Sequence, residues 1–583
     1  MSSAPTKKGY LCLALHGHLP YVVSHGAWPH GTDWLCEAAA ECYLPVLRAL
    51  TGLVEEGLSP KMCLGLTPVL VEQLRSREFV AEFHRYLDHK QESARADEQH
   101  FRGQGQPGAA GLAERWVGFY GDLKRDFAER WGEDLIGAFG RLQDEGHIEI
   151  LTSAATHAYL PLVGLDECVQ AQVALGVESY RRHFGRDPRG FWLPECGYRP
   201  RYRWAPPLGG TGLSTSLRKG VDEFLSESGL EYFIVDSQLL QGGEALGVYR
   251  ERFEALGRLW RVFAAQQPVR EKVESNSPYQ AYLAESSGEG KRPVAFFARD
   301  QRTGLQVWSR EHGYPGDGWY LEFHKKHFPG GHRYWRVTSS KADLGEKEWY
   351  EPDRVRDRIE ENAAHFVGLA HELLLGHWEE TGEPGVVCAP YDAELFGHWW
   401  FEGPEWLAAV VRKMAASEDI GLATGSEYLA TVPAVQLFGL PEGSWGEGGF
   451  HWVWLNEWTE WTWRHVYECE VRARTLCRAL RAGDEEAERV VQQCLRELVL
   501  LESSDWQFLI TTWSARDYAE ARFAEHLAAF QWLAGCAERV LAGQPVSDAE
   551  RAQLGMYEER DCLFARLDPA WYARAAFPAT EGR

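Results

Sequence analysis

The stretch Phe191-Trp192-Leu193-Pro194-Glu195-Cys196-Gly197-Tyr198 is the part of the sequence that indicates the fold. Its first three residues are apolar, as in a short buried strand. Pro194 lacks a backbone donor, which a strand tolerates only where its pairing stops. Glu195 therefore follows the carboxyl end of a buried strand, between neighbours that would be unusual around a solvated surface glutamate. We interpret Glu195 as a functional carboxylate.

A second stretch has the same construction. The apolar run 386–389 leads through Pro390 and Tyr391 to Asp392. Glu394 is a nearby competitor, which we expect to point elsewhere. Two carboxylates at strand ends, surrounded by Trp, Tyr and His side chains, are what the cleavage of a glycosidic bond needs. If one is the nucleophile and the other the acid/base, the fold must bring them to about 5–5.5 Å from each other.

Short apolar runs followed by polar residues recur along the chain. The others cover residues 11–15, 148–151, 232–235 and 294–298, and stretches of helical character lie at 36–55, 169–184 and 351–371. Strands that alternate with helices predict a parallel sheet with buried strands. Polar residues at the carboxyl ends of many strands favour a closed barrel with its site on that face. An open doubly wound sheet stays possible from the pattern alone, although no G-x-G-x-x-G follows the first strand.

Two interruptions of the strand–helix alternation, and a change to helical periodicity near the end of the chain, predict the domain organisation. Residues 84–141 read as a helical insertion, in which the polar stretch 91–111 precedes a helical stretch 112–143. A second interruption spans 238–292; its part 266–291 is polar and reads as a long surface loop, a kind of segment that often forms a lid. The last part of the chain has helical periodicity at 467–480, 484–501 and 517–541, and a capping box at Ser547 opens a further helix.

Composition excludes several classes of function. The formal net charge of the 583 residues is −24, which disfavours binding to nucleic acid or to anionic membranes. The chain holds 25 Trp, the side chain best suited to stack on sugar rings, although most of them are expected in the core. No stretch reads as a secretory signal or a membrane span. The 12 Cys include no C-x-x-C pair, which argues against a disulfide framework and a zinc ribbon and favours a reducing cytoplasm.

The motif His16-x-His18 follows the first apolar run, and its two imidazoles share one face if they lie in a strand. Three readings are open at this point. The pair could bind a metal with His157 as a third ligand, hydrogen-bond sugar hydroxyls beside a carboxylate, or be structural. His371, although followed by Glu372, falls in an apolar-periodic helix and reads as structural.

Two aromatic segments are candidates for the walls of a substrate groove. One runs from Arg299 through Trp308 to 313–317, and the other covers 444–456. Gly448 and Gly449 would let the backbone approach a ligand closely. We predict Trp308, Trp445, Trp454 and Trp34 as sugar platforms; the alternative is an aromatic core beneath a loop.

The chain resembles glycoside hydrolase family 57. Five motifs in order carry the resemblance: His16-Gly17-His18-Leu19-Pro20, Ala155-Thr156-His157, Trp192 to Tyr198, Ala389 to His398, and Ser444 to Asn456. Members have an incomplete (β/α)7 barrel, a small helical insertion and a helical C-terminal domain. We therefore expect an α/β fold, namely a distorted (β/α)7 TIM-like barrel at 1–83 and 142–425, a helical insertion at 84–141 and an all-helical domain at 426–583.

Within that family the chain is similar to the 1,4-α-glucan branching enzymes. The resemblance implies Glu195 as nucleophile, Asp392 as acid/base and substrate contacts through Arg299, Gly316 and Trp445. It also implies that Asp505 is the contribution of the helical domain to the groove. Ser514 stands where members usually carry Gln, and Tyr249 is similar to a lid tyrosine that favours transfer over hydrolysis.

The expected activity is cleavage of α-1,4 bonds and formation of α-1,6 branches through a covalent glycosyl-enzyme, without metal or cofactor. The expected partner is an α-glucan such as amylose, amylopectin or glycogen, in the cytoplasm, with no nucleic acid and no membrane. The alternatives are an α-amylase or 4-α-glucanotransferase on the same site, a metal-dependent carbohydrate deacetylase built on His16 and His18, and a non-catalytic glucan-binding module.

Overall fold

The computed structural model describes residues 7–241, 276–285, 292–309, 313–339 and 341–573. Tyr249 and most of the predicted surface loop lie outside the described residues. Within that loop, however, the described segment 276–285 contains strand β8 (Tyr282–Ala284), so the prediction of a loop without secondary structure is wrong there. This strand pairs with a neighbouring strand of the sheet, and its residues Tyr282 and Ala284 are buried there.

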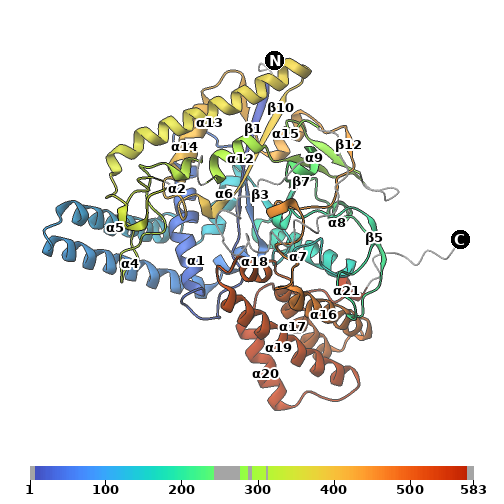
Figure 1. The fold of residues 1–583 in the computed structure, drawn as a ribbon. Helices are drawn as coiled ribbons and strands as arrows, with labels where there is room; N and C mark the ends of the chain where they lie inside the picture. Colours follow the sequence, from blue (N-terminus) through green and yellow to red (C-terminus); the bar gives the residue numbers. More distant parts are fainter. Residues whose placement is uncertain (1–6, 242–275, 286–291, 310–312, 340, 574–583) are drawn as a thin grey trace.

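Seven parallel strands form the wall of a barrel (Figure 1). In order around the wall they are β10 (Gly385–Asp392), β1 (Gly9–Gly17), β2 (Met62–Leu66), β3 (Ile148–Ser153), β4 (Gly190–Trp192), β7 (Tyr232–Val235) and β9 (Ala295–Ala298). A single parallel bridge between Arg299 and Cys388 joins β9 to β10, and the Asp300 amide donates to the Cys388 carbonyl at 3.0 Å. The predicted distorted (β/α)7 TIM-like barrel is therefore confirmed.

The strands are buried on both faces, which explains why they read as continuous apolar runs. Strand β2 was not predicted, because Gly65 interrupts its apolar residues. That glycine has a packing reason: a Cβ there would lie 2.9 Å from Nδ1 of His16. Three short strands extend the sheet, namely β8, β12 (Leu437–Phe438) beside it, and β11 (Ile420–Leu422) beside β1.

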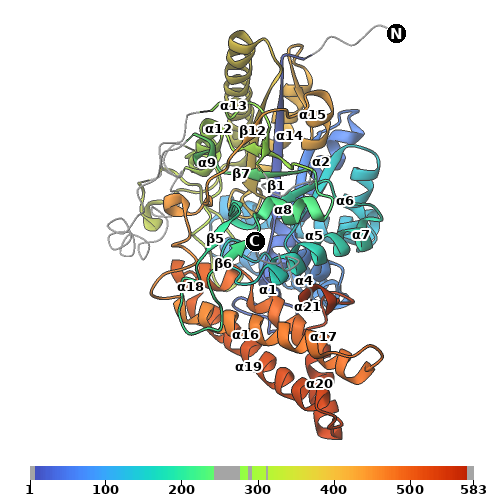
Figure 2. The same cartoon turned by 90° about the vertical axis from the view of Figure 1, so that its right-hand side faces the viewer.

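Helices surround the barrel (Figures 1 and 2). They are α1 (Thr32–Ala38), the π-helical turn η1 (Ala39–Tyr43), α2 (Leu44–Glu55), α3 (Pro68–Leu74), α6 (Leu135–Asp144), α7 (Asp166–Phe184), α8 (Val221–Glu227), α9 (Gln238–Gln241), α12 (Gln301–Trp308), α13 (Pro352–Thr381), α14 (Gly403–Ala415) and α15 (Gly425–Thr431). Helix α13 was predicted only as far as residue 371 and continues to Thr381, where Gly382 ends it in a left-handed conformation.

A helical hairpin projects from the barrel at the place of the predicted insertion (Figure 1). It consists of α4 (Arg77–Gly103) and α5 (Pro107–Arg125). The stretch 91–111, predicted as a polar interruption, is mostly helical. Its polar residues cover the outer side of α4, while Ala94, Asp97 and Phe101 are buried.

Six further helices form a separate layer below the barrel in Figures 1 and 2. They are α16 (Glu460–Ala479), α17 (Glu485–Leu501), α18 (Asp505–Thr512), α19 (Arg516–Leu541), α20 (Asp548–Arg560) and α21 (Ala570–Ala573). The predicted capping box at Ser547 is present. The exact domain bounds remain predictions: β12, which pairs in the barrel sheet, falls within the range 426–583.

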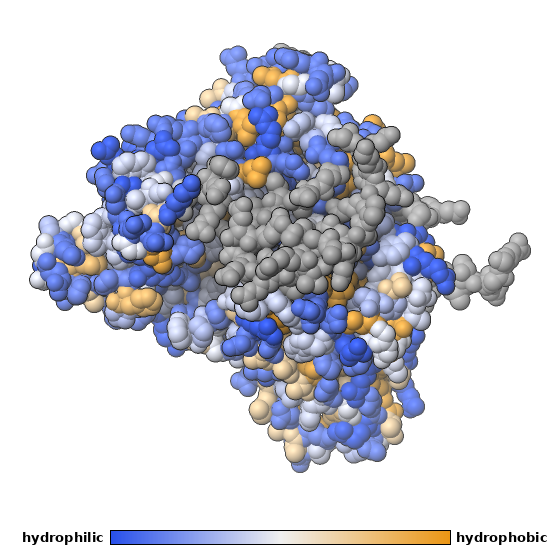
Figure 3. Space-filling view, in the orientation of Figure 1, coloured by the Kyte–Doolittle hydropathy of each residue, from blue (hydrophilic) through white to orange (hydrophobic). Residues whose placement is uncertain are grey.

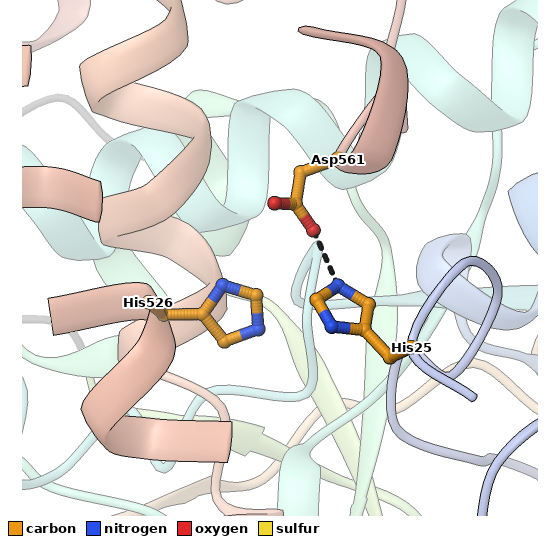
Figure 4. Close-up of side chains that lie close together, drawn as sticks. All are labelled: His25, His526 and Asp561. Carbon is orange, nitrogen blue, oxygen red and sulfur yellow. Dashed lines mark hydrogen bonds and ion pairs between the residues drawn. The ribbon is translucent and has the colours of Figure 1, made fainter. Parts of the chain in front are cut away.

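A buried network of charged groups ties the first barrel loop to this helical layer (Figure 4). His25 Nε2 lies 2.7 Å from Oδ1 of Asp561, and the Asp561 side chain is fully buried. Nδ1 of His526, on α19, lies 2.8 Å from Oε2 of Glu497, while Arg522 lies 3.0 Å from its Nε2. These hydrogen bonds use Nε2 of His25 and both nitrogens of His526. The network thus links segments that are distant in the sequence.

On the face seen in Figure 3 the described surface is mostly hydrophilic, with hydrophobic areas scattered over it. None of the described helices combines the length and the apolar character that a membrane span requires. All 12 cysteines lie in the described part of the chain and are free thiols, and Cys562 is the exposed one among them.

Candidate active site

Glu195 lies in a strained turn directly after β4. Its φ and ψ of 59° and 22° belong to the left-handed region, which a residue other than glycine adopts at a cost. Two contacts hold the turn in place: the Cys196 amide donates to the Leu193 carbonyl, and the Trp445 amide donates to the Glu195 carbonyl at 3.0 Å. The strain directs the carboxylate into the barrel mouth instead of along the strand.

The Glu195 carboxylate has one defined donor. Trp445 Nε1 donates to Oε2 at 2.7 Å, while Oε1 lies 4.0 Å from Nδ1 of His157. Burial raises the pKa of Glu195 to about 7; the Trp445 bond and the His18 charge lower it, and the Asp505 charge raises it. One carboxylate oxygen is thus fixed by an N–H group.

Two neutral histidines support this carboxylate. His16 Nε2 and His157 Nε2 lie 3.0 Å apart, so one ring donates to the other. His16 also stacks flat on Trp192, with ring centroids 4.5 Å apart and planes 3° from parallel, and His157 Nδ1 lies 2.9 Å from the Ser504 hydroxyl. Burial lowers the pKa of both histidines well below the usual value, which favours the uncharged imidazoles.

His18 differs from these two histidines because it pairs with a carboxylate at hydrogen-bond distance. Its Nε2 lies 3.0 Å from both carboxylate oxygens of Asp505, and its Nδ1 lies 3.0 Å from the Thr67 hydroxyl. Burial lowers the pKa of His18, but the charge and hydrogen bond of Asp505 outweigh it and leave the pKa raised. Asp505, the first residue of α18, thus joins the helical layer to the barrel mouth.

Asp392 is the last residue of β10 and is aligned with His16 across the β1–β10 ladder. Burial is the largest cause of the raised pKa of the Cys196 thiol, and the charges of Glu195 and Asp392 raise this pKa further. Both carboxylates therefore act on the same small region. Glu394, expected to point elsewhere, is held beside the cluster: its Oε1 accepts from the His18 amide at 3.0 Å and from the Tyr43 hydroxyl at 2.5 Å. The separation of the two proposed catalytic carboxylates stays a prediction.

Arg299 and Trp308 lie around Trp445. The Arg299 guanidinium is 5.6 Å from the Trp445 ring and forms an ion pair with Asp236. The centroid of Trp308 is 6.3 Å from that of Trp445. Each of these two tryptophans is only 6% exposed, so they offer edges and the Trp445 N–H to the site more than open faces.

The prediction of Trp454 as a sugar platform is wrong. Trp454 is 1% exposed and stacks on Tyr159, with centroids 4.2 Å apart, so both of its faces are covered by protein. The close approach expected at Gly449 is made by a side chain: a Cβ there would lie 1.8 Å from Oε1 of Gln238. The alternative reading, an aromatic core beneath the loop, holds at these positions.

Three further predicted contacts lie outside the cluster of Glu195, the histidines and Asp505. Trp34, on α1, packs 5.7 Å from His30. Gly316 closes the short turn Tyr314–Gly316 through its amide, and the exposed Ser514 hydroxyl lies 2.8 Å from that of Thr512. Among the described residues these three take no part in the hydrogen bonds of the cluster, and their roles remain predictions.

Sequence reasoning missed several members of the site. Trp192 was assigned to the strand, yet its ring is the support of His16. Ser504 directly precedes Asp505 in the sequence, and this neighbourhood was the signal that could have identified it. Tyr43 carried no signal, because it lies inside an apolar helical stretch.

A family model described as glycosyl hydrolase family 57 matches residues 12–441, a range that contains Glu195 and Asp392. The chain belongs to this family. A second model, described as the C-terminal part of 1,4-alpha-glucan branching enzyme, matches residues 465–572, which cover α17 to α21 and most of α16. Membership of family 57 accounts for the barrel and for the order of the five motifs.

Relatives within the family match nearly the whole chain. The 1,4-alpha-glucan branching enzyme TK1436 of Thermococcus kodakarensis is 41% identical over 96% of this chain and 77% of its own sequence. Its crystal structure has a TM-score of 0.86 over 98% of both chains, and that of a branching enzyme from Pyrococcus horikoshii has 0.85 at 39% identity over 98% of both chains. The alpha-amylase AmyC of Thermotoga maritima is more distant, at 29% identity and a TM-score of 0.78 over 98% of this chain and all of its own.

Proposed function

We propose that this protein is a retaining 1,4-α-glucan branching enzyme. The observation that carries the proposal is the carboxylate of Glu195, which is held in a strained turn by Trp445 at the mouth of a family 57 barrel. The match of residues 465–572 to the C-terminal part of branching enzymes supports branching over hydrolysis, as do the branching-enzyme relatives at 39–41% identity. The proposed location is the cytoplasm, in agreement with the free thiols.

In the proposed first step, Oε1 of Glu195 attacks the anomeric carbon of an α-1,4 bond. The bond to the leaving O4 breaks as Asp392 gives that oxygen its proton, and a covalent glycosyl-enzyme forms. Trp445 holds Oε2 throughout, so the orientation of the attacking oxygen is fixed before the reaction. The neutral pair His16–His157 lies beside Glu195 without a charge that would compete with the oxocarbenium-like transition state.

In the proposed second step, the 6-hydroxyl of another glucan chain attacks the same anomeric carbon. Asp392 now takes the proton of that hydroxyl, and Glu195 leaves as a carboxylate. If water took the place of the 6-hydroxyl, the result would be hydrolysis, so the ratio of the two products depends on how well the groove holds an acceptor chain. We propose that Asp505, at the start of α18, and His18, which pairs with it, hold this chain.

Incubation with amylose tests the reaction. We expect new α-1,6 bonds, counted as short linear chains after treatment with a debranching enzyme, to exceed new reducing ends formed before that treatment. Amylopectin and glycogen are the other proposed substrates. Reducing ends that accumulate without debranchable bonds would replace the proposal by the α-amylase alternative, which the likeness to AmyC keeps open.

Replacing Trp445 by Phe is expected to change the pH dependence of the reaction. Only the ionised Glu195 attacks, so kcat/KM should fall about tenfold per pH unit well below the Glu195 pKa of about 7. The indole N–H lowers that pKa, and its loss should raise the pKa and move the acid limb to higher pH. The rate at pH 6 should fall by about 10–100-fold, more than at pH 8, as expected for the loss of a hydrogen bond to a charged group.

Trp308→Phe is the matched control, because Trp308 packs on Trp445 without a hydrogen bond to Glu195. Its acid limb should stay where the unmodified protein has it, whatever happens to KM. An acid limb that is unmoved in Trp445→Phe would show that the indole N–H does not set the ionisation of the nucleophile.

A further inference from the structure

A cavity of about 680 Å³ lies between the helical hairpin and the barrel helices α2, α13 and α14. Its lining includes none of the residues of the cluster around Glu195. The turn η1 lies between the two: Glu41 lines the cavity, whereas Tyr43 bonds Glu394 beside His18. The volume is that of a site for a ligand the size of a short oligosaccharide.

One buried acceptor in this lining has no partner. Glu402, the N-cap residue of α14, is 3% exposed, and its Oε1 accepts from the Tyr350 hydroxyl at 2.7 Å and from the Leu321 amide at 3.0 Å. Its Oε2 is buried and forms no hydrogen bond among the described residues. A buried oxygen without a partner is costly, and this one belongs to a residue that lines the cavity.

Aromatic rings form another part of the lining. The centroids of Trp116, Phe119 and Phe401 lie 5.2–5.5 Å from one another. Phe119 and Phe401 are only partly buried, so part of their surface is accessible from the cavity. The C–H faces of a sugar ring pack on such rings, while its hydroxyls need both donors and acceptors nearby.

The charges of the lining are nearly balanced. Most are paired: Arg48 with Asp126, Arg333 with Glu41, Arg412 with Glu56, and Glu360 with Lys413. Arg115, Arg356 and Glu405 remain at the exposed edge. Burial raises the pKa of Glu405 and the two arginines lower it, which places all three within electrostatic reach of one another. Donors and acceptors alternate there without a strong excess of positive charge, which suits a neutral polyhydroxyl ligand better than an anion.

We propose that this cavity binds a short segment of α-glucan, so that one polymer chain is held at a second place on the enzyme while it reacts at the first. Ring faces of the glucan pack on Phe119 and Phe401, and Arg115 donates to its hydroxyls from the edge. The choice of α-glucan among neutral sugars rests on the proposed function.

Affinity electrophoresis in gels that contain amylopectin tests the proposal, because it measures binding without any reaction. The variant Arg115→Ala/Phe119→Ala changes one exposed and one partly buried side chain, and its rate with a small substrate reports whether the fold is intact. We expect its dissociation constant for amylopectin to rise about fivefold or more, while its rate with a short activated donor, maltosyl fluoride, stays unchanged. Arg95→Ala, an exposed arginine of α4 outside the cavity, is the matched control and should behave as the unmodified protein.

Two outcomes would overturn the proposal. One is equal retardation of the double variant and the Arg95→Ala control. The other is a loss of retardation in the unmodified protein when glucose 6-phosphate is added but not when maltotriose is added, which would assign the cavity to an anion. Neither outcome depends on whether α-1,6 bonds form, so failure of the second site and failure of the proposed reaction are distinguishable.

Discussion

Glu195→Gln is expected to lower kcat on amylose by at least about 10⁴-fold, because the amide cannot form the glycosyl-enzyme. Glutamine keeps the shape of the side chain and an oxygen that can accept the Trp445 N–H bond, so the turn and its strained backbone should remain. Binding of amylopectin should persist. Asp392→Asn should cause a loss of similar size with amylose, whose leaving group needs a proton, and a much smaller loss with maltosyl fluoride, whose leaving group does not.

Rescue by azide separates the roles of the two carboxylates. With maltosyl fluoride, Glu195→Gly leaves space for azide to attack the anomeric carbon directly, which gives the β-glycosyl azide. In Asp392→Gly the glycosyl-enzyme still forms, and azide displaces Glu195 to give the α-glycosyl azide. The same anomer from both variants, or full activity in Glu195→Gln, would contradict the assigned roles.

Asp561→Ala is expected to destabilise the junction between barrel and helical layer by about 3–5 kcal/mol, because it leaves buried partners uncompensated. The Asp561 carboxylate is fully buried against His25 and next to Arg560. Because the unfolding entropy of a chain this long is large, the melting temperature should fall by only about 2–4 °C, measured by scanning calorimetry. Glu525→Gln is the control: Glu525 also faces His25, at 3.4 Å, but is half exposed, so its change should have little effect.

The difference in stability between the unmodified protein and Asp561→Ala should depend on pH. Burial raises the pKa of Asp561, but the His25 bond and the charges of His526, His25 and Arg560 outweigh it, so the pKa lies well below its usual range. The stability from this group is present above the unfolded pKa of about 4 and is lost as the pH falls through the folded value. The two proteins should therefore differ most near neutral pH and converge in acid. A difference that is absent at pH 7 would show that the network is dispensable.

The sequence predicted those parts of the fold that local patterns control. Buried parallel strands are continuous apolar runs, so six strands of the barrel were found, whereas β2 was missed because Gly65 reads as a strand breaker. That glycine is explained only by His16, which lies on a neighbouring strand. The stretch 91–111 was misread for a related reason: a two-helix hairpin buries little of each helix, so most of its residues are polar.

The same division holds at the site. Glu195 and Asp392 were visible because a carboxylate among apolar residues is unusual locally. The support of Glu195 was less visible, since Trp445, His157 and Ser504 meet through contacts of 250 to 347 residues in sequence separation. Buried tryptophans such as Trp454 contribute to the tryptophan count in the same way as exposed ones. Composition therefore could not separate sugar platforms from core residues.

Neighbouring strands of the barrel are joined by different numbers of paired residues. Strands β1 and β10 are aligned at eight residue pairs, whereas β9 meets β10 at the single pair Arg299 and Cys388. A junction with so few hydrogen bonds is where a closed sheet separates first when thermal motion opens it. Arg299 lies in that junction and against Trp445 at once. The position of Arg299 against Trp445 therefore depends on the joint with the fewest paired residues, and it should change with temperature more than the β1–β10 seam does.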